Sequence, residues 1–275
     1  MPDFHAIARE LGPRPSGQPR PVSGGCIHDS YRWGEWFIKT NSAHHADPFR
    51  AEAEGLRALA AVGTIRVPVV LGHGLTGDTA WLALEALDLA SSGDEAALGE
   101  QLAALHASTA DVFGFPHDNY LGSTPQPNHP TASWPGFFRD QRIGHVCRLL
   151  RRQGNVIPES DAFLEVLPQL LPADPPASLL HGDLWAGNKG FLSDGTPVLF
   201  DPAVYHGDAE TDLAMTRLFG GFGPRFYQAY RHHRPAPDDE ATLHGLYNLH
   251  HLLNHALLFG GGYLAQARGV MRRYL

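Results

Sequence analysis

The sequence predicts an α+β fold with two lobes: an N-terminal β-sheet lobe with one main helix over residues 1–88, and a mostly helical C-terminal lobe over residues 89–275. Three observations support this prediction. Short β-rich runs alternate with turns in the first third of the chain, whereas apolar residues recur at helical spacing from residue 94 onward. The 275 residues, 43% of them hydrophobic, are also enough to bury the core of one large domain or of two lobes.

Two β-rich segments follow a short helix that is expected at residues 4–12. Residues 21–33 and 36–40 flank a Gly-containing tight turn, which predicts a β-hairpin. The loop within the first segment contains Gly24 and Gly25, whose missing side chains would let backbone amides approach phosphate oxygens closely. Paired glycines are more often an ordinary turn, so this loop alone identifies no binding site.

Lys39 ends the second strand of this hairpin, a position where a lysine is usually solvated. A helix is expected over residues 47–62, with Asp47 as its N-cap. This helix offers two carboxylates, Glu52 and Glu54, as candidates for an ion pair with Lys39. We expect Glu52 to be the partner, because Glu54 lies two residues further on and points away from the face that Glu52 presents.

Two further strands are expected at residues 65–71 and 79–87, and the second runs out into a connector at Glu85 and Leu87. The boundary between the lobes is therefore placed near residue 88. Helical spacing of apolar residues predicts the helices of the second lobe at residues 94–108, 137–152, 161–171, 225–233, 239–258 and 265–274. Residues 113–135, rich in Pro, Gly, Asn and aromatics, predict a long loop, and loops of this length tend to be functional.

The strongest chemical signal begins after a short strand expected at residues 177–180. Asp183 is followed after four intervening residues by Asn188, and an apolar run then ends at Asp201. This is the order that a kinase needs, because Asp183 can take the proton of an acceptor hydroxyl while Asn188 and Asp201 offer hard oxygens to magnesium. A single Asp is usually a turn or cap residue, but here the order, the spacing and the strand agree. The sequence therefore predicts an ATP-dependent phosphotransferase with a protein-kinase-like fold.

This loop changes the interpretation of the upstream positions. In a kinase the lysine at the end of the corresponding strand contacts the α- and β-phosphates, which gives Lys39, with Glu52, a role in ATP binding. A strand that runs into a connector is where such a fold hydrogen-bonds adenine, so the backbone groups of Glu85 and Leu87 become candidates. The loop at residues 113–135 is then expected to wall the acceptor site.

The spacing after the catalytic loop indicates the kind of acceptor. Asp212 follows Asp201 too closely for a phosphorylatable activation segment, and Gly182 stands where a regulated protein kinase usually carries an arginine. We therefore expect the acceptor to be a small molecule, or a small group attached to something larger. Asp212 itself either braces the catalytic loop or caps a helix.

Composition excludes several other classes of protein. The 21 basic and 29 acidic residues give a formal charge of -8, which provides no footprint for nucleic acid. No stretch is typical of a membrane span or a secretory signal, so a soluble, cytoplasmic protein is expected. Two cysteines, Cys26 and Cys147, cannot form a disulfide framework. His251 and His255 have a spacing that can bind zinc, but without a Glu between them or a third ligand they are better interpreted as pocket-lining or packed residues.

Three motifs are more specific than the kinase pattern: Thr124–Asn128 (Thr-Pro-Gln-Pro-Asn), Trp185 in the catalytic loop, and Phe259–Tyr263 (Phe-Gly-Gly-Gly-Tyr). Further motifs along the chain are Gly24–Ile27, Phe37–Asn41, Phe49–Glu52, Leu102–His106, Phe113–Phe115, Asn119–Gly122, His181–Asn188, Phe200–Ala203 and Leu253–His255. Over nearly its full length the sequence thus resembles the fructosamine kinase family, also called ketosamine-3-kinases. This family lies within the wider group that includes aminoglycoside phosphotransferases and choline kinases.

The resemblance implies ATP-dependent phosphorylation of the sugar 3-hydroxyl of ketosamines, the rearranged adducts of sugars with amines. Such 3-phosphates release the amine, so the family is considered a deglycation system. Carried over by position, Asp183 is the base, Asn188 and Asp201 are the magnesium ligands, and Lys39 with Glu52 positions the phosphates of ATP. Trp185 is similar to the family residue that flanks the sugar.

Several expectations stay open at this point. His251 and Asn254, which lies in the Leu253–His255 motif, are further candidates for the substrate site. A thiol at Cys26, beside the glycine loop, would allow a monomer to become a disulfide-linked homodimer on oxidation; packing under the sheet is an equal interpretation. The ketosamine could be a small molecule or attached to a protein. The rival functions are a related aminoglycoside or choline kinase and a non-catalytic nucleotide-binding module.

Overall fold

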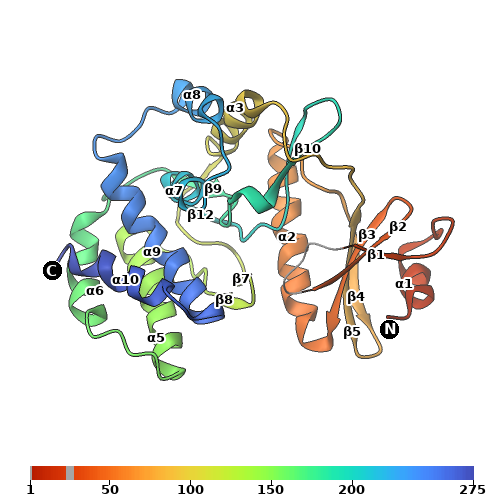
Figure 1. The fold of residues 1–275 in the computed structure, drawn as a ribbon, viewed down its shortest axis with the longest axis horizontal. Helices are drawn as coiled ribbons and strands as arrows, with labels where there is room; N and C mark the ends of the chain where they lie inside the picture. Colours follow the sequence, from red (N-terminus) through yellow and green to blue (C-terminus); the bar gives the residue numbers. More distant parts are fainter. Residues whose placement is uncertain (1, 23–27) are drawn as a thin grey trace. The chain divides into compact units, whose positions relative to one another are not determined.

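The computed structural model describes residues 2–22 and 28–275, so Gly24, Gly25 and Cys26 lie outside the described residues. The chain divides into two compact units, drawn in Figure 1. The first comprises Met1–Asp94 and Lys189–Pro202, and the second comprises Glu95–Asn188 and Ala203–Leu275. Strands dominate the first unit and helices the second, which confirms the predicted α+β class.

The first unit is built on a five-stranded sheet in the order β1-β2-β3-β5-β4. Every pair of neighbouring strands in it is antiparallel. The strands are β1 (Arg20–Val22), β2 (Asp29–Trp33), β3 (Trp36–Ser42), β4 (Val70–Thr76) and β5 (Thr79–Glu85). The hairpin of β2 and β3 confirms the two β-rich runs predicted around the Gly34 turn.

Helices α1 (Phe4–Leu11) and α2 (Ala46–Val62) lie on opposite faces of this sheet (Figure 1). Successive residues of a strand point to opposite faces, and β3 shows the consequence. Ile38 packs with Ile7 of α1 in a small core that also contains Trp33 and Trp81. Its neighbour Lys39 points to the other face and contacts α2. Because side chains alternate along β3, the hydrophobic core shared with α1 and the polar contact with α2 lie on opposite faces of the sheet.

Strand β4 begins later than the sequence predicted. The expected strand covered residues 65–71, whereas the observed strand covers Val70–Thr76 and has a bulge between Val70 and Gly72. Pro68 cannot donate to a ladder, which disfavours the earlier position. The later position was hidden by Gly72 and Gly74, which resemble turn residues in sequence. A Cβ at Gly74 would lie 2.8 Å from the Trp81 ring, so the strand needs glycine where that ring packs.

Residues 189–202 cluster with the first unit, although the sequence analysis placed all of residues 89–275 in the second lobe. They form a hairpin of β10 (Lys189–Phe191) and β11 (Pro197–Leu199). The reason is backbone pairing, since Ala90 bridges Phe191 and Arg66 bridges Val198. The compact units divide at residue 94, a few residues after the predicted boundary at residue 88.

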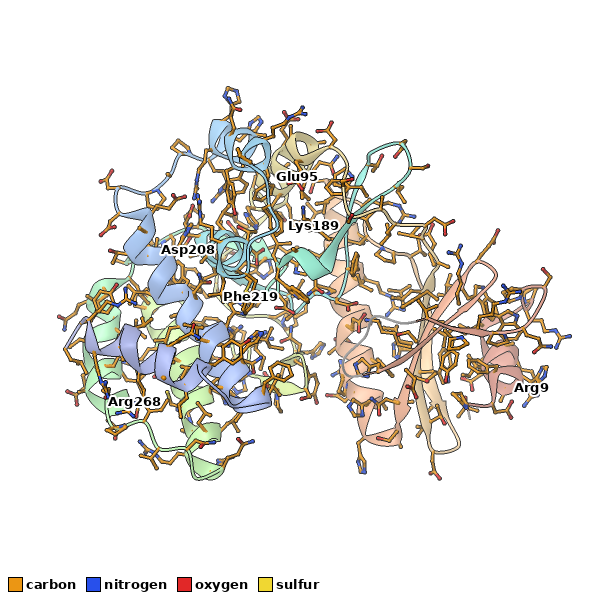
Figure 2. All side chains as sticks on the ribbon, in the orientation of Figure 1. Arg9, Glu95, Lys189, Asp208, Phe219 and Arg268 are labelled. Carbon is orange, nitrogen blue, oxygen red and sulfur yellow. The ribbon has the colours of Figure 1, made fainter. Side chains whose placement is uncertain are left out.

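The second unit is mostly helical, and side chains fill the space between its helices (Figure 2). Its helices are α3 (Glu95–Leu105), α4 (Trp134–Phe137), α5 (Gly144–Arg152), α6 (Ser160–Leu170), α7 (Glu210–Leu218), α8 (Pro224–His233), α9 (Glu240–Phe259) and α10 (Tyr263–Arg272). Buried residues of α9, among them Leu246 and Leu253, lie in the large core of this unit. Within the described part of the chain no helix is both long and apolar enough to cross a bilayer.

Two regions of the second unit differ from their predicted structure. The helix expected at residues 137–152 is interrupted by a π-helix, Phe138–Ile143, between α4 and α5. The loop expected at residues 113–135 contains a hairpin of β7 (Asn119–Leu121) and β8 (Thr124–Gln126).

A separate three-stranded sheet, ordered β12-β9-β6, consists of β12 (Tyr205–Gly207), β9 (Ala177–Leu180) and β6 (Thr109–Ala110). Strand β9 leads into the predicted catalytic loop.

Candidate active site

Lys39, Glu52 and Asp201 form an ionic cluster in the first unit. The Nζ of Lys39 donates to Oε1 of Glu52 at 2.7 Å and to Oδ1 of Asp201 at 2.5 Å. Lys39 is only 6% exposed. The pairing of Lys39 with Glu52 is therefore confirmed, whereas Glu54 bonds Arg50 at 2.7 Å. Helix α2 thus supplies one carboxylate of the cluster and the segment after β11 supplies the other.

This cluster has more negative than positive charge. Burial alone would lower the pKa of Lys39, but Asp201 and Glu52 outweigh it and hold that pKa above its usual range, so the ammonium stays charged. Burial raises the pKa of Glu52 to about 7; Lys39 opposes this rise and Asp201 adds to it. The raised pKa of Glu52 reflects two carboxylates that share one ammonium, an arrangement that a further cation would stabilise. The carboxylate of Asp201, 44% exposed, therefore fits a magnesium ligand.

Asp201 has an unusual backbone conformation. Its φ of 56° makes it the one non-glycine residue with positive φ among those described. Asp tolerates the left-handed region better than most residues because its short polar side chain can hydrogen-bond locally. Such conformations occur where surrounding structure imposes them, often at functional sites.

The catalytic loop of the second unit is held by Asp212 of α7. Asp212 accepts the backbone N–H of His181 at 2.7 Å with Oδ2 and that of Gly182 at 2.9 Å with Oδ1. The bracing role predicted for Asp212 is thus confirmed. The alternative as an N-cap is wrong, because α7 begins at Glu210. His106, the residue after α3, donates a further bond from its Nε2–H to Oδ2 of Asp212 at 3.1 Å, which ties the end of α3 to the same anchor.

Asp183 and Asn188 are joined within this loop. The Nδ2 of Asn188 donates to the backbone oxygen of Asp183 at 2.9 Å and to its Oδ2 at 3.1 Å. Because the amide nitrogen faces Asp183, the side-chain oxygen of Asn188 points away from it. An amide oxygen is a group suited to magnesium, and a carboxylate is a group suited to the proton of a hydroxyl.

Trp185 presents an aromatic surface close to Asp183 in sequence. Its side chain is 40% exposed, and its ring covers Gly187, where a Cβ would lie 2.2 Å from the ring. The backbone of the loop supports this position, since Asn188 N–H donates to the Trp185 oxygen at 3.0 Å. A partly exposed indole face next to a candidate base is suited to stacking on a sugar ring.

His251 and Asn254 lie on α9 and are both buried. The Nδ2 of Asn254 donates to the oxygen of Leu121 at 3.3 Å, but its Oδ1 and the Nδ1 of His251 have no hydrogen-bond partner among the residues that the structure describes. Burial, with a smaller contribution from His255, lowers the pKa of His251 to about 3, so the ring is neutral. His255 donates its Nδ1–H to the His251 oxygen at 2.8 Å, which commits that nitrogen to the backbone.

The candidate adenine residues have different surroundings. The Glu85 carboxylate bonds Arg66 and the Val69 N–H, and the backbone N–H of Glu85 donates to the Val69 oxygen at 2.8 Å. Its side chain therefore anchors the end of β5. Leu87 lines an open depression of the first unit. The other residues that line it are Arg32, Asp88, Leu89, Ala90 and Ser193.

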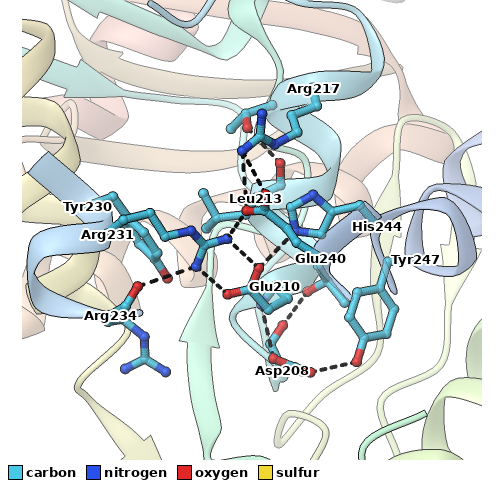
Figure 3. A network of polar contacts seen from close by, with 12 residues as sticks. Asp208, Glu210, Leu213, Arg217, Tyr230, Arg231, Arg234, Glu240, His244 and Tyr247 are labelled. Carbon is cyan, nitrogen blue, oxygen red and sulfur yellow. Dashed lines mark hydrogen bonds and ion pairs between the residues drawn. The ribbon is translucent and has the colours of Figure 1, made fainter. Parts of the chain in front are cut away.

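A further charged cluster, in the second unit, was not predicted from the sequence. Glu210, Glu240 and His244 have ligand atoms close enough to hold a metal ion. Arg231 already lies between the carboxylates, donating to Glu210 at 2.6 and 2.7 Å and to Glu240 at 2.5 Å (Figure 3). The cluster therefore fits a structural network that ties α7 to α8 and α9. Glu240 and His244 are four residues apart on α9, but Glu210 and Arg231 lie on other helices, so no single local motif reveals the cluster.

The fold and these groups define a class of protein. A strand lysine paired with a helix glutamate, a braced Asp-x4-Asn loop and a further Asp after an apolar hairpin are the parts of a phosphotransferase with a protein-kinase-like fold. The family model described as fructosamine kinase matches residues 5–275. The chain belongs to the fructosamine kinase family, and the predicted class of enzyme is confirmed.

Individual relatives agree with this assignment. A probable ketoamine kinase of Synechocystis sp. is 43% identical and covers 99% of this chain and 97% of its own length. The chloroplastic protein-ribulosamine 3-kinase of Arabidopsis thaliana is 36% identical, covering 92% and 81%. A crystal structure of a proposed fructosamine-3-kinase from Haemophilus somnus 129PT has a TM-score of 0.91 at 28% identity, covering 98% and 96%. An aminoglycoside phosphotransferase with a TM-score of 0.60 at 13% identity, covering 98% and 97%, shows the shared fold alone.

Proposed function

We propose that this protein uses ATP and magnesium to phosphorylate the sugar 3-hydroxyl of ketosamines, in particular ribulosamines or fructosamines. The observation that carries the proposal is the braced loop in which Asn188 holds Asp183 while Asp212 fixes the two preceding amides. The name of the Arabidopsis thaliana relative, a ribulosamine 3-kinase, supports the choice of acceptor and of hydroxyl. Spontaneous loss of the 3-phosphate from the product would complete a deglycation.

Each residue has a proposed part in this reaction. Asp183 accepts the hydrogen bond of the sugar hydroxyl and takes its proton as the new O–P bond forms. Lys39, oriented by Glu52, binds the phosphates of ATP, and Asn188 and Asp201 offer oxygens to magnesium. When bound, the magnesium complex of ATP supplies the phosphoryl group and neutralises the charge that develops on it. Trp185 stacks on the sugar, and His251 and Asn254 are proposed to offer their buried polar atoms to the acceptor.

Product analysis tests this function. Purified protein would be incubated with ATP, magnesium and, separately, a ribulosamine, a fructosamine, an aminoglycoside and choline, while ATP consumption is followed. We expect phosphorylation of a ketosamine at the 3-hydroxyl, identified by mass spectrometry and phosphorus NMR, followed by release of the amine. A clear preference for the aminoglycoside or for choline would contradict the proposal, and no turnover of any acceptor would favour a nucleotide-binding module.

Three further parts of this proposal rest on the sequence and not on the structure. A cytoplasmic location is proposed from the sequence alone. The ketosamine is proposed to be either free or attached to a protein. For Cys26, outside the described residues, we propose a thiol that can link two copies on oxidation. Non-reducing gels of the wild type and Cys26→Ser after peroxide treatment decide this, because a dimer that survives the substitution excludes the link.

A further inference from the structure

Four buried polar residues of the second unit have no part in the function proposed so far. Asn119, Gln126 and Asn128 belong to the β7–β8 hairpin and the residues after it, and Arg142 belongs to the π-helix. None of them is more than 5% exposed. Polar side chains this deeply buried are stable only when hydrogen-bonded, so the partners of these residues indicate what they do.

The four residues form a continuous relay of hydrogen bonds. The Nη2 of Arg142 donates to Oδ1 of Asn128 at 2.7 Å, and Nδ2 of Asn128 donates to Oδ1 of Asn119 at 2.9 Å. The Nδ2 of Asn119 then donates to the backbone oxygen of Val204 at 2.7 Å. Gln126 adds a branch, donating from Nε2 to Oδ1 of Asn119 at 2.9 Å and to the Ala203 oxygen at 3.3 Å. The relay ends on two successive backbone carbonyls.

Both ends fix the direction of this relay. A guanidinium can only donate and a backbone carbonyl can only accept, so Asn128 must present its oxygen to Arg142 and Asn119 must present its nitrogen to Val204. The orientation of each amide therefore follows from chemistry, without any choice between nitrogen and oxygen. Hydrogen bonds in such a chain polarise one another, which strengthens the last bond to Val204.

Burying the charged side chain of Arg142 in this way costs free energy. Among the described residues its hydrogen bonds go to oxygens of Pro127, Gln141 and Asn128, none of them a carboxylate. Its guanidinium lies over the rings of Phe137, at 4.5 Å, and Tyr205, at 4.0 Å. Burial lowers the pKa of Arg142 to about 10, which still leaves it charged at neutral pH. Asp118 opposes this fall in pKa only in part, so the buried charge of Arg142 is costly and depends on these hydrogen bonds.

The segment at the end of the relay contacts the catalytic loop. The N–H of Ala203 donates to the His181 oxygen at 2.9 Å. The Ala203 oxygen lies so close to Gly182 that a Cβ there would be 2.0 Å away. Ala203 therefore forms the surface on which the residues immediately before Asp183 rest, opposite the anchor provided by Asp212.

We propose that Arg142, Asn128, Asn119 and Gln126 are positioning residues for phosphoryl transfer. They hold the carbonyls of Ala203 and Val204, and through Ala203 they fix His181, Gly182 and the direction of Asp183. The inference rests on the proposed function in naming Asp183 as the base. It also assigns a role to the Thr124–Asn128 motif: the Gln and Asn of this motif support the catalytic loop from behind.

The substitution Asn128→Asp separates positioning from folding. The introduced carboxylate accepts from Arg142 and neutralises its buried charge, so the urea midpoint is expected to be kept. It cannot donate to the His117 oxygen, which Nδ2 of Asn128 bonds at 3.1 Å, or to Asn119, whose amide is expected to turn its nitrogen toward position 128 and its oxygen against the Val204 carbonyl. We expect kcat about tenfold below wild type, the factor that one ordinary hydrogen bond corresponds to, with the KM for ATP unchanged.

Gln141→Glu is the matched control. It makes the same change of charge beside Arg142, but Gln141 bonds the backbone of His129 at 2.7 Å and lies outside the relay. Its kcat is expected to stay within about twofold of wild type. Equal kcat values for Asn128→Asp and Gln141→Glu in an active enzyme would overturn the proposal.

Hydrogen–deuterium exchange gives a readout that needs no substrate. We expect faster exchange over residues 181–184 and at the Ala203 amide in Asn128→Asp than in Gln141→Glu, and equal exchange would also overturn the proposal. If the wild type phosphorylates no ketosamine, the proposed function is refuted. Hydrogen–deuterium exchange alone would then test whether the relay holds the catalytic loop in place. If Asn128→Asp fails to fold, Gln126→Met replaces it in the comparison with Gln141→Glu. It removes the donor to Ala203 and Asn119, together with an Oε1 atom that has no partner in the described part of the chain.

Discussion

Gly182 is the residue at which the catalytic loop is packed most closely. Its φ of +82° is unfavourable for a residue with a side chain, and a Cβ would lie 2.0 Å from the Ala203 oxygen, which is backbone and cannot rotate away. We expect Gly182→Ala to lower the free energy of unfolding by about 3 kcal/mol, from backbone strain and overpacking together. Urea unfolding followed by circular dichroism measures this, and activity should fall as well.

Gly154→Ala isolates the backbone contribution to that effect. Gly154 has a similar φ of +84°, but a Cβ there would meet nothing within 4 Å. The expected loss is therefore about 1 kcal/mol, the cost of the left-handed conformation alone. Similar losses for both substitutions would show that the contact with Ala203 is unimportant.

Asp183→Asn tests the proposed base. The amide is close to the carboxylate in shape but cannot take a proton, so kcat is expected to fall by about a thousandfold. ATP should still bind with unchanged affinity in isothermal titration calorimetry, because Lys39 and Glu52, the proposed phosphate-binding pair, belong to the first unit. A variant that keeps a tenth or more of wild-type kcat would exclude Asp183 as the base.

Single residues could be predicted from sequence where local geometry decided the outcome. The choice of Glu52 over Glu54 needed only the directions of two side chains on one helix, and it is confirmed by the bond to Lys39. Arg142 was missed because its partners are oxygens, two of them backbone atoms, and those of Pro127 and Asn128 come from a different segment of the chain. No residue type marks such a contact in advance.

At the scale of elements, the network of Figure 3 joins α7, α8 and α9 through Glu210. Burial opposes ionisation of Glu210, but hydrogen bonds from Arg231 and His244 outweigh it and lower the pKa to about 2. A depressed carboxyl pKa contributes stability above the usual value of 4.5, and this contribution is lost as the pH falls from 4.5 toward 2. The network therefore protects these three helices at neutral pH and fails in acid.

We expect Glu210→Gln to reduce the free energy of unfolding at neutral pH by about 3 kcal/mol. The same variant should lose less stability than wild type between pH 4.5 and 2. Urea midpoints across this range measure both effects, with Glu165→Gln on the exposed side of α6 as a control. Parallel pH profiles for wild type and Glu210→Gln would show that the network does not set the acid sensitivity.

Elements with strong periodicity were predictable, whereas elements shaped by packing were not. Helix α9, expected at residues 239–258, is observed at Glu240–Phe259. Strand β4 was displaced because Gly72 and Gly74 accommodate the Trp81 ring, a tertiary requirement that resembles a turn signal. The β7–β8 hairpin was hidden in an apparent loop because its short strands contain Pro125 and depend on buried amides for support.

At the scale of the whole molecule, the ionic cluster of Lys39, Glu52 and Asp201 belongs to the first unit, the unit to which ATP binding is assigned by our proposal. If magnesium and ATP bind at this cluster, as proposed, they should raise the melting temperature of the wild type. Ligand at about 100 times its Kd stabilises the binding-competent state by about 2.7 kcal/mol. Differential scanning fluorimetry with and without magnesium measures the shift, which should shrink when the metal is chelated.

Asp201→Asn is expected to lose most of this shift. Asn also tolerates positive φ, so the substitution removes the charge and keeps the backbone conformation. Asp161→Asn, on the surface of α6, is the control and should respond like wild type. A full shift in Asp201→Asn would exclude Asp201 as a magnesium ligand.

The domain division could be predicted only approximately from sequence. The connector after β5 gave a boundary near residue 88, but nothing local indicates that residues 189–202 pair with Ala90 and Arg66. Backbone bridges between distant segments depend on the folded arrangement, so sequence order alone misplaces them.

The π-helix at Phe138–Ile143 makes the length of this region as important as its composition. A π-helical turn accommodates an additional residue compared with an α-helical one. Deleting one residue here would let α4 and α5 merge into an uninterrupted α-helix with little change in helical content or in the relative orientation of its two ends, but it would remove the wider turn from which Arg142 reaches Asn128. The guanidinium of Arg142 would then no longer contact the residues that it supports. A deletion that looks conservative in sequence would therefore lower the catalytic activity.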